Sequence, residues 1–157
     1  QLLCHQTNKS LYVFIFFNST NLYIKRSTFT QIIDGSAIKI DRLQSPQIAK
    51  SKLILINAIF INNTSLYQGG SLCVLNVTKV SIQDSKFLSN KAQRGGSIFG
   101  ENIMYLSMRN SVLSRNSAKS GGAISFVDIN NTVLDTLIIM YNFASDYGGG
   151  LELRHCN

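Results

Sequence analysis

The acidic side chains are the groups that could carry out chemistry in this chain of 157 residues. Polysaccharide cleavage needs two carboxylates about 5–10 Å apart, or a Ca²⁺ cluster with a basic residue beside it. Glu101 and Asp128 come nearest to such a pair, since they follow two Gly-Gly pairs by five and six residues. Solvated turn residues would explain both positions equally well. The eight acids are Asp34, Asp41, Asp84, Glu101, Asp128, Asp135, Asp146 and Glu152.

Histidine and cysteine offer no clearer site. His5 and His155 lie at opposite ends of the sequence, and the odd number of cysteines, Cys4, Cys73 and Cys156, has no metal-ligand spacing. We therefore expect no catalytic residues, no metal site and no cofactor, and we predict that the protein is not an enzyme.

A repeated motif organises the chain instead. Gly-Gly pairs begin at positions 69, 95, 121 and 148, so that they are 26, 26 and 27 residues apart. An Asn precedes each pair by five or six residues. A fixed period of this length is typical of a solenoid. The expected structural positions are Asn63, Asn90, Asn116, Asn142, Gly69, Gly70, Gly95, Gly96, Gly121, Gly122, Gly148 and Gly149.

Apolar residues recur in columns when the repeats are aligned on the Phe that precedes the Asn. Seven residues before this anchor, the column reads Leu22, Leu53, Val80, Leu106 and Thr132, and the anchor itself is Phe29, Phe60, Phe87, Leu113 and Ile139. Residues two apart on a strand share a face, and stacked coils would bury these columns as one core. We predict an all-β fold, a right-handed single-stranded parallel β-helix with about 26 residues per coil and five to six coils. Asn side chains would form a hydrogen-bonded ladder at one corner, and Gly pairs would allow a tight bend.

The chain divides into two parts. Residues 1–21 are expected to form an N-terminal coil or cap with an apolar strand, and residues 22–157 the β-helix repeats. The spacing between Gly35 and Gly69 exceeds one period by about eight residues, which predicts an insertion loop near 41–50 around Pro46, the one proline. The apolar run 11–17 is too short to span a bilayer, so we expect no transmembrane segment.

The combination of Phe-x-x-Asn with Gly121-Gly-Ala-Ile124 resembles the repeats of chlamydial polymorphic outer-membrane proteins. It is also similar to pectin-lyase-like β-helix repeats in surface proteins of ciliates and other protists. The resemblance covers residues 53–152, with a weaker copy at 22–38, and Leu113 and Ile139 depart from it by replacing Phe. It implies a surface, adhesive or structural β-solenoid and contributes no catalytic residues.

The net charge and the N-glycosylation sequons indicate which partners and which location to expect. The net charge is +7, but the basic residues are scattered and no nucleic-acid-binding motif accompanies them, so we expect no nucleic-acid partner. A diffuse positive charge suits acidic glycans or a negatively charged surface at least as well. Six Asn-x-Ser/Thr sequons, which favour an extracellular or cell-surface protein with N-linked glycans, occur at Asn8, Asn18, Asn62, Asn63, Asn76 and Asn130.

Cys4 and Cys156 lie at the two ends of the predicted stack, about 25 Å apart, which is too far for a disulfide within one chain. They would pair between molecules, if at all; two free cysteines are an equally good interpretation. We expect an extracellular structural or adhesive solenoid that stacks end to end on itself into a filament, or that forms part of a larger surface protein. The alternative is a carbohydrate-binding or polysaccharide-cleaving β-helix.

Overall fold

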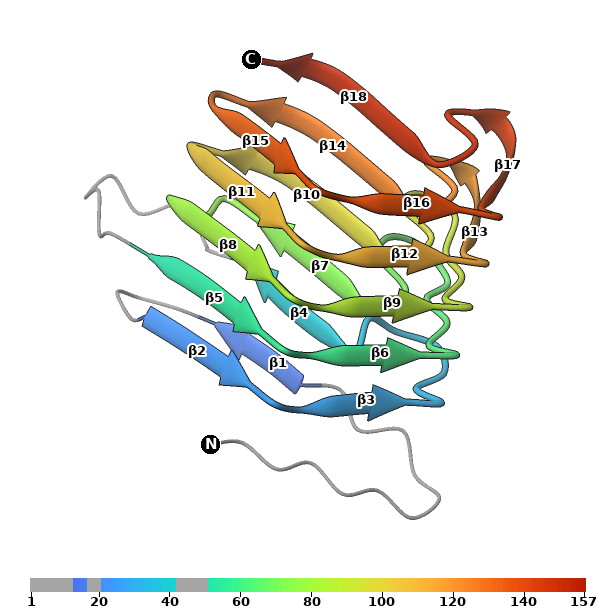
Figure 1. Ribbon diagram of the computed structural model, residues 1–157, viewed down its shortest axis with the longest axis horizontal. Coiled ribbons are helices and arrows are strands. Elements are labelled where there is room, and N and C mark those ends of the chain that lie inside the picture. The colour runs from blue at the N-terminus through green and yellow to red at the C-terminus, as the bar shows by residue number, and fades with distance from the viewer. Residues whose placement is uncertain (1–12, 17–20, 42–50) are drawn as a thin grey trace.

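Parallel strands stacked in coils form the whole of the described protein (Figure 1). The structure, a computed structural model, describes residues 13–16, 21–41 and 51–157. Sheet A contains β1 (Val13–Phe16), β4 (Ile38–Asp41), β7 (Leu72–Leu75), β10 (Ile98–Ile103), β14 (Ile124–Ile129) and β18 (Leu151–Cys156). Sheet B contains β2 (Asn21–Lys25), β5 (Lys52–Ile56), β8 (Lys79–Gln83), β11 (Tyr105–Arg109) and β15 (Thr132–Asp135).

Two further sheets complete each coil. Sheet C contains β3 (Thr28–Thr30), β6 (Ile59–Ile61), β9 (Lys86–Leu88), β12 (Val112–Ser114) and β16 (Ile138–Met140). Sheet D contains only β13 (Ser117–Ser120) and β17 (Phe143–Tyr147). The chain passes through sheets A, B and C in turn, and each strand pairs with its equivalent one coil later (Figure 1).

The register confirms the predicted β-solenoid. Leu22, Leu53, Val80, Leu106 and Thr132 are partners across five successive strands, and the anchor positions from Phe29 to Ile139 are partners in the same way. The expected five to six coils are an overestimate, because the structure has about four turns. Four complete turns separate the five strands of sheet B, so counting repeat copies in the sequence overstates the number of turns between them.

Alternation of side chains creates the core. In β5 the side chains of Leu53 and Leu55 are buried while their neighbours are partly exposed, which is the period of two that a strand imposes. The rings of Phe29, Phe60 and Phe87 stack on one another, with centroids 4.8 and 5.0 Å apart. Each such buried side chain contributes about 1.5–3 kcal/mol relative to an exposed one, and stacking coils brings one from every turn into the same interior.

An asparagine ladder runs beside this phenylalanine stack. The Asn90 side-chain oxygen accepts from the backbone N–H and the side-chain amide of Asn63, both at 3.0 Å. Asn90 in turn donates to the Asn116 oxygen, and Asn116 to that of Asn142. Each amide also donates to the carbonyl of the anchor residue one coil earlier, as Asn90 does to Phe60 at 3.2 Å. The ladder therefore supplies the hydrogen bonds that a buried corner would otherwise lack.

The corners between sheets adopt left-handed backbone conformations. Residues three before each anchor all have positive φ: Arg26 (50°), Asn57 (53°), Asp84 (50°), Asn110 (47°) and Thr136 (53°). Asn and Asp enter this region more readily than most residues, which accounts for part of the asparagine-rich composition. The first Gly of each pair is also left-handed, and the second has a different role. A Cβ on Gly96 would lie 2.7 Å from the Ser117 carbonyl oxygen in the next coil.

Two predicted features fall largely outside the described residues. Of residues 1–21, the structure describes β1, which pairs with β4, and Asn21 at the start of β2. The predicted insertion near 41–50 occupies residues 42–50, which lie between β4 and β5 and outside the described ranges. Within the described ranges there is no helix of the length and apolarity needed to cross a membrane.

Candidate binding groove on the sheet B flank

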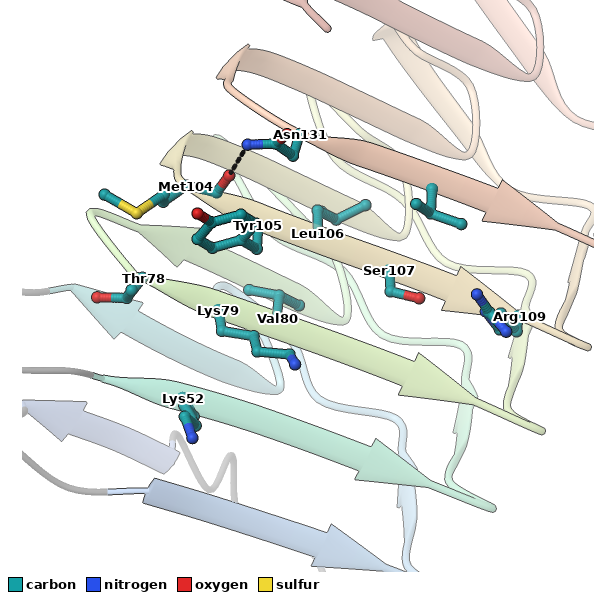
Figure 2. Close-up of a pocket in the computed structure, with 11 residues that line it drawn as sticks. Lys52, Thr78, Lys79, Val80, Met104, Tyr105, Leu106, Ser107, Arg109 and Asn131 are labelled. Carbon is teal, nitrogen blue, oxygen red and sulfur yellow. Dashed lines mark hydrogen bonds between the residues drawn. The ribbon is translucent and has the colours of Figure 1, made fainter.

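An open groove of about 590 Å³ lies on the outer surface of sheet B. Its lining comes from β5, β8, β11 and β15 and from the corners that precede them, so residues up to 81 positions apart in sequence share one surface (Figure 2). We call it the flank groove. The side chains that give it its character are Lys52, Lys79, Met104, Tyr105, Arg109 and Val133.

The same alternation that fills the core places these side chains outside. Lys52, Lys79 and Tyr105 each precede an inward residue of the Leu53 column by one position, so they point away from the core. Lys52 is the register partner of Lys79, and Lys79 is the partner of Tyr105. Neighbouring strands lie about 4.7–4.9 Å apart, so the three side chains rise from adjacent rungs of one column.

Basic residues outnumber acidic ones on this flank. Each of four consecutive strands of sheet B carries one outward basic residue, and the fifth strand carries an acid, so the strands have four positive charges against one negative. In order, these residues are Lys25, Lys52, Lys79, Arg109 and Asp135. A net excess of three positive charges over one sheet face creates a local field that attracts anions.

The lysines of the groove have no acidic partner within the protein. Every Asp and Glu of the chain lies in the described ranges. The ion pairs found in those ranges join Arg154 to Glu152 at 3.4 Å and His155 to Asp128 at 2.9 Å. The ammonium groups of Lys52 and Lys79 are therefore available to an external anion.

An apolar strip accompanies the charges. Tyr105, Met104 and Val133 are 49%, 41% and 44% exposed, although each is large and apolar. Figure 2 shows Tyr105 beside Met104, above Lys79, and the Asn131 side-chain amide donates to the Met104 carbonyl at 3.2 Å. Exposed apolar surface rimmed by polar groups is typical of a site that contacts another molecule. The flank groove can thus supply both charge and an apolar contact surface.

A second hollow continues along the same flank. It has a volume of about 530 Å³ and is lined by Tyr23, Lys25, Arg26, Ile56 and Asn57 at the end of β2 and β5. Two of its five lining residues are basic and one is aromatic, so this hollow, like the flank groove, combines basic and aromatic side chains. The outer surface of sheet B thus has recesses over both its earlier and its later strands.

The two carboxylates that come nearest to a pair in the sequence, Glu101 and Asp128, are offset by one position across adjacent strands. Glu101 is the register partner of Val127, and Asp128 is the next residue of β14, with a left-handed backbone (φ of 53°). Asp128 instead contacts the exposed imidazole of His155 at 2.9 Å. Within the described ranges, no group of three or more His, Cys, Asp or Glu side chains is arranged to hold a metal ion.

The cysteines have contrasting surroundings. Cys73 is buried in β7, and burial raises the pKa of its thiol to about 12. Cys156 is partly exposed on β18, where its Sγ lies 3.3 Å from the Arg154 carbonyl oxygen. Cys4 lies outside the described residues, so its proposed intermolecular pairing with Cys156 stays a prediction.

The sequons also differ in exposure. Asn62 is exposed, whereas the adjacent Asn63 is fully buried in the ladder and its side-chain nitrogen is already a donor. Asn76 is partly buried and Asn130 is exposed. Asn8 and Asn18 lie outside the described residues. Of the two overlapping sequons, only Asn62 presents a side chain that a glycan could extend from without breaking the core.

The flank groove was missed by sequence analysis that followed only the inward columns. Reading the outward position one residue before the Leu53 column would have given Lys52, Lys79 and Tyr105 in succession. The signal was present, but its meaning depends on knowing that these residues share a register.

Comparison with known proteins found no matching protein family, no matching curated protein and no matching solved structure. The chain is therefore classified by its fold alone, as a parallel β-solenoid with a repeat of about 26 residues.

Proposed function

We propose that this protein is a non-catalytic, extracellular structural or adhesive β-solenoid that binds a surface polysaccharide through the flank of sheet B. The observation that carries this proposal is the flank groove, an open recess in which basic and apolar side chains stand in register on consecutive coils. These outward positions contribute nothing to the buried core, so the fold does not account for their residue types. The stacked strands supply the rigid support that a repeating ligand requires.

Adhesion can be measured with microspheres coated with the protein and applied to surfaces that carry different polysaccharides. We expect the coated spheres to bind at least one such surface, and Tyr105→Ser to weaken the binding because it removes the aromatic contact. Tyr67→Ser is the matched control, since Tyr67 is 72% exposed but lies outside the flank groove. No binding to any polysaccharide, or equal losses in both variants, would contradict the proposed function.

Stacking between copies is a second candidate function, and it would use the face of the coil that contains β15 to β18. Leu134, Leu137 and Ile139 pack against the core on one side and are only partly buried. At the opposite end, Ile24 and Phe29 are buried, and β2 and β3 are the edge strands of sheets B and C among the described residues. Head-to-tail stacking without rotational closure produces a filament.

One glycine allows this second candidate to be tested. In the lower coils, a Cβ on Gly70, Gly96 or Gly122 would meet the backbone of the next coil, whereas a Cβ on Gly149 would lie 4.0 Å from its nearest neighbour, the Asn142 carbonyl oxygen. Gly149→Val should therefore leave the single molecule folded but block a coil that docks above it. Negative-stain microscopy should show filaments for the native protein and dispersed rods for this variant. Dispersed rods for both would reject stacking, and loss of filaments in reductant would implicate Cys4 and Cys156.

A further inference from the structure

We propose that the flank groove binds a linear polyanionic polysaccharide, a glycan that carries carboxylate or sulfate groups along its chain. This inference rests on the proposed adhesive function and names the ligand class of the same surface. The observation behind it is the set of basic side chains in the groove lining. Lys52 and Lys79 are register partners on adjacent strands, and Arg109 lies at the other end of β11, four positions beyond Tyr105, the partner of Lys79.

The stacking of two lysines is unfavourable in the protein alone. Lys52 and Lys79 are direct register partners on adjacent strands, and like charges in that arrangement destabilise a sheet. No acidic side chain of the chain lies within ion-pair distance of either lysine. An anion held between the two ammonium groups would remove the repulsion, so the arrangement is better suited to a bound state than to an empty one.

The repeat of the cations suits a polymer better than a single small anion. Strands of sheet B are about 4.7–4.9 Å apart, so Lys52 and Lys79 lie on neighbouring rungs, and Arg109 lies on the next strand about 13 Å further along the strand direction. A linear chain that crosses the sheet diagonally can meet all three cations, whereas a small anion cannot. Arg109, on the third rung above Lys25, adds a planar guanidinium that can bind a carboxylate or a sulfate through two parallel hydrogen bonds. A ligand with charges at regular intervals would engage several rungs at once, which raises its overall affinity without any single strong contact.

The apolar strip favours a sugar chain over a nucleic acid. Tyr105 is the one aromatic residue in the lining of the flank groove, and it lies beside Met104. Val133, which also lines the groove, is the register partner of Ser107 on the next strand. Proteins that bind single-stranded nucleic acid place successive bases on a series of aromatic side chains, which this groove lacks. One ring next to aliphatic side chains instead matches the apolar C–H face of a sugar residue.

The inference can be tested by comparing two double variants that remove the same charge. Lys52→Gln/Lys79→Gln neutralises the groove, while Lys91→Gln/Lys119→Gln neutralises two exposed lysines that do not line it. Binding would be measured by biolayer interferometry to polygalacturonate, dextran sulfate, neutral dextran and single-stranded DNA. Thermal unfolding of each variant would verify that its fold is intact.

We expect the groove variant to bind at least one of the two polyanionic glycans about 3- to 30-fold more weakly, as two lost surface ion pairs predict. The control variant should stay within twofold of the native protein, and salt should weaken native binding. The polygalacturonate and dextran sulfate arms would show whether carboxylate or sulfate is preferred.

Several results would overturn the inference. Equal losses in the two variants would show that overall charge, not the groove, binds the glycan. DNA bound as tightly, with the same dependence on Lys52 and Lys79, would identify a nucleic-acid site. Binding to neutral dextran that depends on Tyr105 but not on the lysines would reject the anionic ligand and leave the adhesive function standing. Absence of binding to every polysaccharide would reject both.

Discussion

Replacing Asn90 with alanine would test how the interior of the stack is held together. The Asn90 side chain is fully buried, and its oxygen accepts from both the backbone N–H and the side-chain amide of Asn63. Its own nitrogen donates to Phe60, Ser97 and Asn116. Because the alanine side chain has no polar atoms, Asn90→Ala removes these five side-chain hydrogen bonds at the middle of the ladder.

The cost follows from the groups that remain unpaired. Two buried donors of Asn63 lose their acceptor, and each unsatisfied buried group costs about 1–3 kcal/mol, which together gives about 2–6 kcal/mol. A folded domain is stable by about 5–15 kcal/mol, so this is a large fraction of the total. Since about 1 kcal/mol shifts Tm by 2–4 °C in a chain of this size, Tm should fall by at least about 4 °C.

The free energy of unfolding would be measured by urea titration followed by circular dichroism. Asn131→Ala is the control, because Asn131 is exposed and makes one side-chain hydrogen bond, to the Met104 carbonyl at 3.2 Å. We expect this control to cost less than about 1 kcal/mol. If Asn90→Ala cost no more than Asn131→Ala, the ladder would not be a source of stability and the reasoning would be refuted.

Two further variants, one labelling experiment and one pH dependence probe other parts of the stack. Gly96→Ala should be strongly destabilising because its Cβ would lie 2.7 Å from the Ser117 carbonyl oxygen, whereas Gly149→Ala should be tolerated; similar Tm values for the two would contradict the close contact between coils. Cys73 should resist a thiol reagent at pH 8 until the protein is unfolded, while Cys156 should react in the folded state, as peptide mass spectrometry would show. Burial raises the pKa of Cys73 from 9.0 to about 12, so the neutral thiol contributes fully to stability below pH 9 and this contribution is lost as the pH rises from 9 to 12. Unfolding free energies that do not fall over that range would argue against a buried neutral thiol.

The fold was largely predictable because the repeat places its core residues at fixed intervals. The column of Leu53, Val80 and Leu106 was identified from spacing alone, and the structure pairs these residues in the expected register. Most inward positions of a solenoid are apolar in successive coils, so a single sequence is enough to reveal the pattern. The number of turns was overestimated because five repeat copies in a sheet enclose only four complete turns.

The corners and the flank groove were harder to predict. Some residues with a left-handed backbone, such as Arg26 and Thr136, are of types that do not predict a positive φ. The surrounding strands impose that conformation on them. Outward residues such as Lys52 and Tyr105 are not constrained by the core, so their types vary from coil to coil. Their significance depends on which of them the register brings together, and that information comes from the structure.

A titration followed by NMR would test most directly whether the sheet B flank is the binding surface. Amide shifts of this 17.4 kDa chain would be recorded while a carboxylated oligosaccharide, and separately a sulfated one, is added. We predict that the changes concentrate on Lys52, Lys79, Tyr105 and Arg109 with at least one of the two ligands. Changes centred instead on β13 and β17, or no change with either ligand, would contradict the account.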